Sequence, residues 1–202
     1  MLCRGLVHYL AGVSKKIIIV GIPGVGKSTL VTKIVEILNS RQKSVSVNSF
    51  GTIMFEEAQK NGIKNRDDLR KLSMEEQQNL QKKAAQKIAK LEDDLVIIDT
   101  HTFINTNAGF YPGLPNSVLE IIKPSNFISV YARPEEIYNR RMKDTTRQRD
   151  VISIDNIKKE MAISDAMLSS CAVFSGSPMK PVFNAEGKVE EAANTVISAI
   201  EI

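Results

Sequence analysis

Cysteine is scarce in this 202-residue sequence, which has only Cys3 and Cys171. The two lie far apart along the chain, and neither belongs to a CxxC pair or to a spacing that suits metal ligands. A disulfide framework and a zinc site are therefore not expected. The same scarcity favours a cytoplasmic protein, because disulfides persist in oxidising compartments.

Long apolar runs are also missing. Residues 1–14 have an apolar character, but Arg4, His8 and Gly12 interrupt them, and the stretch is too short to cross a bilayer. A weak signal peptide is the alternative, although the apolar run that follows is better explained as a buried strand. We expect residues 1–14 to be an N-terminal extension that is disordered or that precedes the true start, and we expect no membrane partner.

A large excess of one charge is the third missing feature. The 27 Lys and Arg residues outnumber the 23 Asp and Glu residues only enough for a net charge of +4. A dedicated nucleic-acid-binding domain would be more basic, so a nucleic-acid partner is not expected, whereas an enzyme for small anionic molecules suits this balance. The length predicts one domain, residues 15–202, rather than two.

Short strand patterns alternate with helical patterns along that domain. Five segments are rich in the β-branched or aromatic residues typical of buried strands. They are residues 15–20, 44–48, 94–99, 126–132 and 180–184. This alternation predicts an α/β fold of three layers, with a five-stranded parallel sheet flanked by helices. Residues 49–90 hold more helix than one crossover needs, which indicates an inserted helical subdomain, and a capping box of Ser73 and Glu76 opens one of its helices.

The sequence GIPGVGKST follows an apolar strand and precedes an amphipathic helix, which is the context of a phosphate-binding loop. Its glycines allow backbone N–H groups to turn toward phosphate oxygens at a helix N-terminus. We expect Lys27 to reach the β- and γ-phosphates of ATP and the Ser28 hydroxyl to bind Mg²⁺. The predicted ATP-binding residues are Gly21, Ile22, Pro23, Gly24, Val25, Gly26, Lys27, Ser28 and Thr29.

Asp99 ends the predicted third strand, LVIID. Its carboxylate should therefore emerge at the carboxyl edge of the sheet, beside the phosphate loop. There we expect it to hold Mg²⁺ through water or to orient the acceptor of the phosphoryl group. A plain turn residue is the alternative, because many strands end in aspartate.

The stretch DTHTFINTNAGFYPGLP, residues 99–115, is too apolar for a surface linker and has too many chain breakers for a helix or strand. We expect a close-fitting loop that forms part of the acceptor wall, with Phe110 and Tyr111 packed against the acceptor. Thr100, His101 and Tyr111 are candidate acceptor-binding residues. Positioning of this loop suits His101 better than general-base catalysis, since phosphoryl transfer needs little proton chemistry from the protein.

The sequence NRRMKDTTRQRD, residues 139–150, brings four arginines into one helix end and the loop after it. Guanidinium groups that close over the site would stabilise the charge spread over the transferred phosphoryl group. A solvated basic face or an RNA-contacting patch is the alternative, but the run lacks interleaved aromatic residues for base stacking. We predict a lid over about residues 139–152, with Arg140, Arg147 and Arg149 as catalytic residues beside the phosphate-loop lysine.

Signalling GTPases share the phosphate loop, but their other motifs are absent from this sequence. Asp99 is followed by THT instead of completing a DxxG sequence. The sequence NRDD at residues 65–68 lacks the lysine of a guanine-reading NKxD box and precedes the third strand. A GTPase switch is therefore not expected.

From about residue 15 to its end, the chain resembles the archaeal type of adenylate kinase, a branch of the nucleoside monophosphate kinases. The resemblance is carried by GIPGVGKST, FGTIMFEEAQKNGIKNRDDLRKL, VIIDTHTFINTNAGFYPGLP and RRMKDTTRQRD. It implies a five-stranded parallel core, an AMP-binding subdomain over residues 49–90, a short lid without zinc, and often a homotrimer. It also implies reversible, Mg²⁺-dependent phosphoryl transfer in which ATP and AMP give two ADP.

One segment departs from the bacterial and eukaryotic adenylate kinases, which carry a DGFPR-like sequence after the third strand. This chain has DTHTF there, so Arg66, Arg70 or Arg133 has to supply the contact with the acceptor phosphate. Two other functions stay open at this point. One is a different phosphate-loop kinase for a nucleotide or small metabolite, and the other is a nucleotide-dependent RNA or ribosome-assembly factor.

Overall fold

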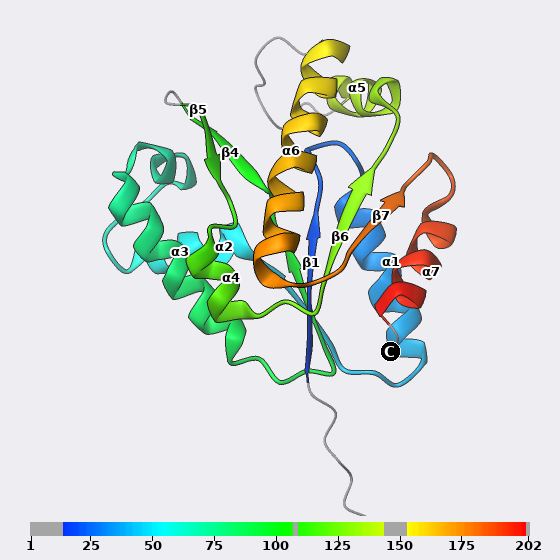
Figure 1. The fold of residues 1–202 in the computed structure, drawn as a ribbon, viewed down its shortest axis with the longest axis horizontal. Coiled ribbons are helices and arrows are strands. Elements are labelled where there is room, and N and C mark those ends of the chain that lie inside the picture. The colour runs from blue at the N-terminus through cyan, green and yellow to red at the C-terminus, as the bar shows by residue number, and fades with distance from the viewer. Residues whose placement is uncertain (1–13, 107–108, 144–152, 201–202) are drawn as a thin grey trace, which may run out of the picture.

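The computed structural model describes residues 14–106, 109–143 and 153–200 (Figure 1). Five parallel strands form the central sheet in the order β2-β3-β1-β6-β7. Their bounds are β1 Lys15–Val20, β2 Val45–Ser49, β3 Leu95–Asp99, β6 Asn126–Tyr131 and β7 Met179–Phe183. The predicted five-stranded parallel sheet is confirmed. Residues 1–13 of the predicted N-terminal extension lie outside the described residues.

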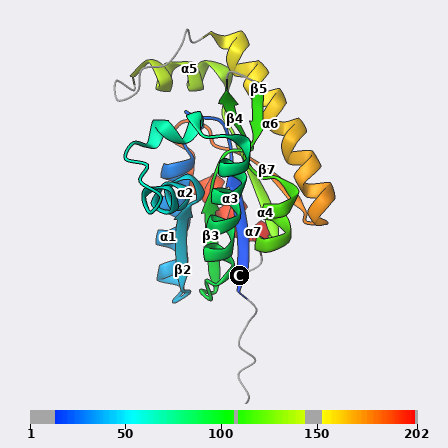
Figure 2. The same cartoon turned by 90° about the vertical axis from the view of Figure 1, so that its left-hand side faces the viewer.

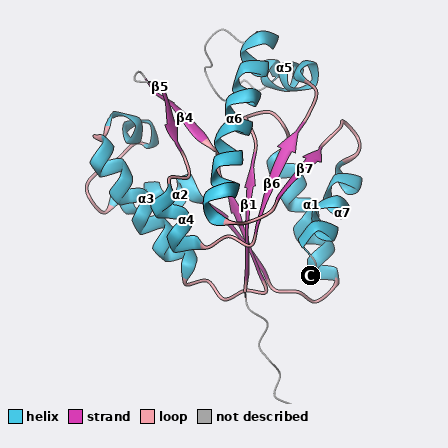
Figure 3. Cartoon of the chain, in the orientation of Figure 1, coloured by secondary structure: helices cyan, strands magenta, loops and turns pink. Residues whose placement is uncertain are grey.

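Helices cover both faces of this sheet, as Figure 3 shows. One face carries α1 and α7, and the other carries α2, α3, α4 and α6. Their bounds are α1 Lys27–Ser40, α2 Phe50–Gln59, α3 Met74–Ala89, α4 Asn116–Ile122, α6 Ile154–Ser175 and α7 Val189–Ile200. The three layers expected from the alternating pattern are therefore present. None of the described helices is long and apolar enough to cross a membrane.

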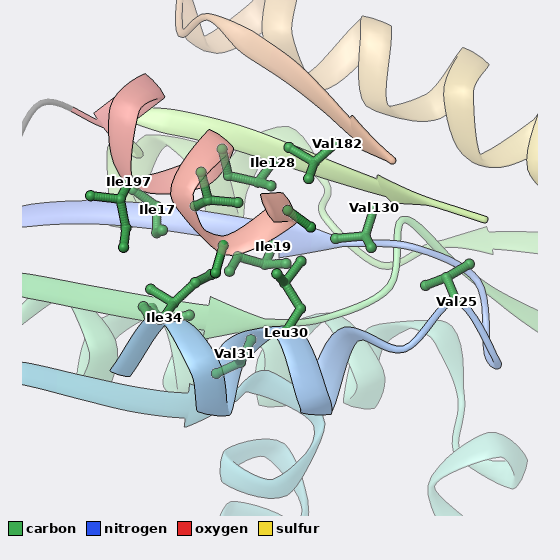
Figure 4. Packing of buried hydrophobic residues seen from close by; sticks show 14 of the residues in the cluster. Ile17, Ile19, Val25, Leu30, Val31, Ile34, Ile128, Val130, Val182 and Ile197 are labelled. Atoms are coloured by element: carbon green, nitrogen blue, oxygen red, sulfur yellow. The ribbon is translucent and has the colours of Figure 1, made fainter. Parts of the chain in front are cut away.

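The central strand β1 supplies alternate side chains to two cores. Ile17 and Ile19 pack toward α1 and α7 beside Leu30 (Figure 4), whereas Ile18 and Val20 pack against the helices of the opposite face. All five side chains have no exposed surface. Full burial of each one contributes roughly 1.5–3 kcal/mol, so these side chains stabilise the middle of the sheet.

The connection from β2 to β3 holds three helical elements. They are α2, the 3-10 helix η1 (Arg66–Lys71) and α3, which begins after a complete capping box of Ser73 and Glu76. Glu57 of α2 links the first and last of them, because its carboxylate accepts from Lys60, which directly follows α2, and contacts Lys87 of α3 at 2.6 Å. This part of the chain is therefore held by an ion-pair network as well as by apolar contacts.

The segment after β3 differs from the expected loop. Residues Phe103–Thr106 form β4 and residues Gly109–Pro112 form β5, and the two pair as an antiparallel sheet. The prediction that residues 99–115 contain no strand is wrong. The reason is positional: glycine and proline occupy the first and last residues of β5, where they interrupt little of the ladder between the two strands.

Candidate functional site

The phosphate loop joins β1 to α1 at the carboxyl edge of the sheet, and Figure 4 shows Val25 in this loop. Gly24 and Gly26 have φ values of 91° and 87°, a left-handed conformation that glycine adopts without strain. A Cβ atom on Gly26 would lie 2.5 Å from Nδ2 of Asn184, so a side chain does not fit there. The loop thus brings bare backbone to the N-terminus of α1, which favours anions.

Side chains from other elements hold the carbonyl groups of this loop. Nε of Arg141 donates to the Pro23 oxygen over 2.8 Å, and Nδ2 of Asn184 donates to the Val25 oxygen over 2.9 Å. A guanidinium nitrogen of Arg140 lies 3.3 Å from the Gly24 oxygen. Because C=O and N–H point in opposite directions in a planar trans peptide, these contacts turn the next N–H groups away from the donors. That is the arrangement of an anion-binding cradle.

Arg140 and Arg141 both come from α5, Pro134–Lys143, which lies beyond the carboxyl edge of the sheet (Figure 2). Arg141 is 7% exposed, and besides Pro23 it contacts a carboxylate oxygen of Glu160 in α6 at 2.7 Å. It therefore joins α5, α6 and the phosphate loop. Arg140 is less buried and pairs with Glu136 at 3.5 Å, which leaves it better able to turn toward a ligand.

Lys27 and Asp99 meet beside the loop, as their predicted positions required. Nζ of Lys27 donates to the Gly21 oxygen over 2.8 Å and lies 3.8 Å from Oδ1 of Asp99. Burial raises the pKa of the Asp99 carboxyl, and the nearby Lys27 ammonium offsets part of that rise. The register explains the meeting: Asp99 pairs with Ile19 of β1, two residues before the loop begins.

The residues around Asp99 fit a magnesium ion. Its Oδ1 atom is buried and has no hydrogen-bond partner among the described residues. Ser28 is exposed in the first turn of α1, immediately after Lys27. Carboxylate and hydroxyl oxygens suit Mg²⁺, which usually keeps several waters and binds through one or two protein oxygens together with substrate phosphates.

Sequence comparison places the chain in a family. A family model described as an AAA domain matches residues 20–158. Over 186 residues the chain is 41% identical to an adenylate kinase of Thermoplasma acidophilum. These residues make up 92% of this chain and 98% of that relative. It is also 37% identical over 190 residues to an adenylate kinase of Methanocaldococcus jannaschii, with 93% and 99% covered. The chain belongs to the adenylate kinase family.

Solved structures agree on the fold. A shikimate kinase from Acinetobacter baumannii superposes with a TM-score of 0.59 at 14% identity, with 93% of each chain covered. A gluconokinase from Sinorhizobium meliloti superposes with a TM-score of 0.54 at 11% identity, with 94% of this chain and 95% of the other covered. The adenylate kinase family member described here therefore has the phosphate-loop kinase fold.

Arg66 lies at a second helix N-terminus on the β2 side of the site. A Cβ atom on Gly51, in the first turn of α2, would lie 2.7 Å from the Arg66 guanidinium, so the glycine leaves room for it. A guanidinium beside a helix N-terminus favours an anion. Arg70 belongs to the same short helix, η1, but its side chain lies outside the described part of the chain.

The hairpin places Tyr111 against α3. Its hydroxyl lies 3.5 Å from Oε1 of Gln81, a side chain 1% exposed whose amide donates to the Pro112 oxygen. Burial raises the pKa of the Tyr111 hydroxyl. Phe110, expected to pack against the acceptor, meets the ring of Phe103 edge to face with 5.0 Å between the ring centroids. The hairpin thus places Tyr111 beside α3 and brings Phe110 against Phe103 of the neighbouring strand.

Thr100 and His101 connect Asp99 to the hairpin. The Thr100 N–H donates to the Ile19 oxygen over 3.1 Å, and the residue is buried. Nδ1 of His101 lies 3.1 Å from the Gly21 oxygen, so this residue contacts the donor loop rather than the α3 side. Of the predicted lid arginines, Arg147 and Arg149 lie outside the described residues.

Sequence reasoning missed two residues that the structure places in the site. Asn184 directly follows β7, as Asp99 directly ends β3, so the rule that strand ends meet at one edge would have found it. Gln81 lies on the buried face of α3 with Leu80 and Ala84. A polar residue within an apolar helix stripe indicates a buried hydrogen-bond partner, which here is Pro112.

Proposed function

We propose that this chain catalyses the reversible reaction of ATP and AMP to two ADP with Mg²⁺. The observation that supports it best is the position of the Lys27 ammonium between the Gly21 carbonyl and the Asp99 carboxylate, at a phosphate loop in a chain of the adenylate kinase family. The helical elements between β2 and β3 stand beside this loop and offer a second anion site at Arg66. Two anion sites suit a donor and an acceptor that both carry phosphates.

The donor would be ATP, bound by residues 21–29 through inward N–H groups. Lys27 would leave the Gly21 oxygen for the β- and γ-phosphates and follow the developing charge during transfer. Ser28, and Asp99 through water, would hold Mg²⁺ in place. Bound there, the ion would neutralise phosphate oxygens and fix their geometry for in-line transfer.

The acceptor would be AMP, held by the subdomain of residues 49–90. Arg66 and Arg70 would contact its phosphate, and the N-terminus of α2 would add to the attraction. Thr100 and Tyr111, which follow Asp99 along the chain, would complete the wall, and Asp99 would also help to orient the attacking phosphate. The absence of a DGFPR-like arginine makes Arg66 the first candidate for substitution, because its guanidinium lies at the N-terminus of α2.

A lid over about residues 139–152 would close the site. Arg140 would turn from Gly24 toward the transferred phosphoryl group, and Arg147 and Arg149 would approach from the lid itself. Closure would exclude water, which would otherwise receive the phosphoryl group. Stabilisation of transition-state charge by arginine is worth about 10³–10⁵ in rate where it has been measured in phosphoryl transfer.

Location and assembly follow from the family rather than from the site. We propose a cytoplasmic protein whose partners are ATP, AMP and ADP, and a homotrimer as its assembly. Light scattering on the purified full chain at micromolar concentration tests the assembly directly. A mass of one chain, about 22.4 kDa, would contradict the trimer without touching the proposed reaction.

A coupled assay for ADP tests the reaction. The full chain is given ATP and Mg²⁺ with AMP, CMP, UMP or GMP, and fast ADP formation is expected with AMP only. Lys27→Met should abolish transfer and leave the fold intact by circular dichroism. ATP consumption with a non-nucleotide acceptor alone, or slow hydrolysis unaffected by any monophosphate and accompanied by salt-sensitive RNA binding, would contradict the proposal.

A further inference from the structure

The Gly21 carbonyl oxygen receives two hydrogen bonds, one from within the phosphate loop segment and one from the connection after β3. Nζ of Lys27 donates to it over 2.8 Å, and Nδ1 of His101 lies 3.1 Å away. A carbonyl oxygen can only accept, so Nδ1 of His101 carries a proton. A carbonyl oxygen has two lone pairs, and these two donors together can engage both.

His101 is held firmly in this position by the backbone on either side of it. The residue before it, Thr100, donates its N–H to Ile19, and the residue after it, Thr102, accepts from the Gly113 N–H over 2.8 Å. The Thr102 hydroxyl also donates to Ser164 of α6 over 2.9 Å, and both side chains are buried.

At the base of the hairpin, the backbone of Gly113 packs directly against the backbone of His101. A Cβ atom on Gly113 would lie only 2.1 Å from the His101 carbonyl oxygen. The two backbone segments therefore touch, so the backbone at His101 cannot shift without moving the hairpin. A fixed backbone at this residue favours one position of the imidazole donor.

The two donors behave differently when a nucleotide binds: one moves and the other stays. Lys27 has to exchange Gly21 for the phosphates, whereas His101 belongs to the β3–β4 connection and keeps its place. Gly21 is buried, and a buried carbonyl left without a donor costs about as much as a lost hydrogen bond. With His101 present, the carbonyl keeps one partner after Lys27 has moved.

We propose that His101 is a positioning residue, which keeps the Gly21 carbonyl hydrogen-bonded and so allows Lys27 to transfer to the nucleotide phosphates at low cost. The inference rests on the proposed use of Lys27 toward ATP. The Nδ1–H group donates its hydrogen bond to the Gly21 oxygen, which gives His101 a role in the ATP-binding part of the site. The hydrogen bond acts through the resident lysine and not on the acceptor.

The test measures ATP affinity by calorimetry with Mg²⁺ and without any acceptor. His101→Ala and His101→Gln should each weaken ATP binding roughly 10-fold, the effect of one hydrogen bond to a buried carbonyl. His101→Asn should stay near the parent value, because its amide nitrogen takes the place of Nδ1, whereas the glutamine nitrogen takes the place of Nε2. Unchanged affinity in His101→Ala, or equal losses in the asparagine and glutamine variants, would overturn the proposal.

A double-mutant cycle with Lys27→Met separates this role from general damage. Without the ammonium, nothing leaves Gly21 when ATP binds, so adding His101→Ala should change ATP affinity less than 2-fold. A loss of about 10-fold in the Lys27→Met background as well would show that His101 acts independently of Lys27 and would overturn the proposal. Ser177→Ala is the matched control: it removes a buried bond to the Pro124 oxygen, away from the phosphate loop, should lower the melting temperature, and should leave ATP affinity unchanged.

Nuclear magnetic resonance gives a readout that needs no ligand. The sequence has only two histidines, so His101→Asn assigns the ring nitrogen signals of the full chain. The proton is expected on Nδ1, and a neutral ring with its proton on Nε2 alone would contradict the hydrogen bond. A chain that binds ATP but fails to phosphorylate AMP would refute the proposed reaction and leave these tests of His101 valid.

Discussion

The side-chain amide of Asn184 donates to the carbonyl oxygen of Val25 over 2.9 Å, although 159 residues separate the two along the chain. Asn184 is 5% exposed, and the same nitrogen lies 3.4 Å from the Gly26 oxygen. The end of β7 therefore holds the phosphate loop at the point where α1 begins. The chain at the end of β7, far from the loop in sequence, thus helps to shape the ATP-binding site.

Asn184→Ala should impair both stability and nucleotide binding. It leaves the Val25 oxygen without its donor, which costs about 1–3 kcal/mol of unfolding free energy in urea titration, and ATP affinity should fall as the loop loosens. Ser177→Ala is the control, since Ser177 makes a similar buried bond to the Pro124 oxygen over 2.6 Å. It should lose comparable stability and keep its ATP affinity; an equal loss of affinity in both variants would refute a specific role for Asn184.

Asp99→Asn should trade activity for stability. Because the pKa of Asp99 is raised in the folded state, its charge costs stability above its ordinary pKa of 3.8, and this cost disappears at lower pH. The comparison is made in a Lys27→Met background, because there Asp99→Asn breaks no ion pair with Lys27. The double variant should be more stable than Lys27→Met alone at pH 7, and the two should be equally stable below about pH 3.8. In the parent chain, activity should fall about 10–100-fold, as for a ligand that holds a metal through water.

Asp94→Asn is the contrasting variant. Hydrogen bonds from the Ser44 backbone N–H and side chain lower the pKa of Asp94, so its charge stabilises the fold above pH 3.8. Its removal should therefore destabilise the chain at pH 7. Urea midpoints that move in the same direction for the Asp94 and Asp99 variants would contradict the opposite environments of the two carboxyl groups.

Glu57→Gln should change how stability depends on acid. Hydrogen bonds from Lys60 and Lys87 lower the pKa of Glu57 from 4.5 to about 2. The stability that this carboxylate contributes is fully present above pH 4.5 and is lost as pH falls toward 2. The difference in urea midpoint between parent and variant should shrink across that window. Glu56→Gln serves as control, because Glu56 is mostly exposed and lies 3.8 Å from Lys87; a difference as large as that of Glu57→Gln would argue against the network.

Gly113→Ala should disrupt the base of the hairpin. The added Cβ would lie 2.1 Å from the backbone oxygen of His101, and no side-chain rotation relieves a clash between two backbones. We expect a loss of about 3 kcal/mol or more. Gly176→Ala, which has a φ of 68° and open space around it, should lose only about 1–2 kcal/mol. Similar melting temperatures for the two variants would contradict the close approach.

Local signals predicted the elements of the fold well. The five strands lie within one residue of their predicted bounds, and the capping box at Ser73 is complete in the structure. Such signals depend on neighbours in the sequence: side-chain alternation, a cap three residues from its partner, and a glycine-rich turn between a strand and a helix. The phosphate loop and Asp99 were found for the same reason.

The number of glycines and prolines in residues 99–115 wrongly argued against the hairpin formed by β4 and β5, because their effect depends on where they stand in a strand. Gly109 and Pro112 stand at the two ends of β5, where they do little harm, and the aromatic pair of Phe103 and Phe110 joins the two strands at 5.0 Å. A pair across two strands becomes visible only when their register is known.

The sequence by itself determined a phosphate-loop kinase with a five-stranded sheet, and the donor loop within it. Only the tertiary structure decided what holds that loop in shape: Arg141, His101 and Asn184 each bond one of its carbonyls from a different part of the chain. These partners lie 80 to 159 residues from the groups they hold. Periodicity and motif spacing describe contacts within a few residues, whereas a contact across such a distance exists only once packing of the sheet and helices has brought the strand ends to one edge.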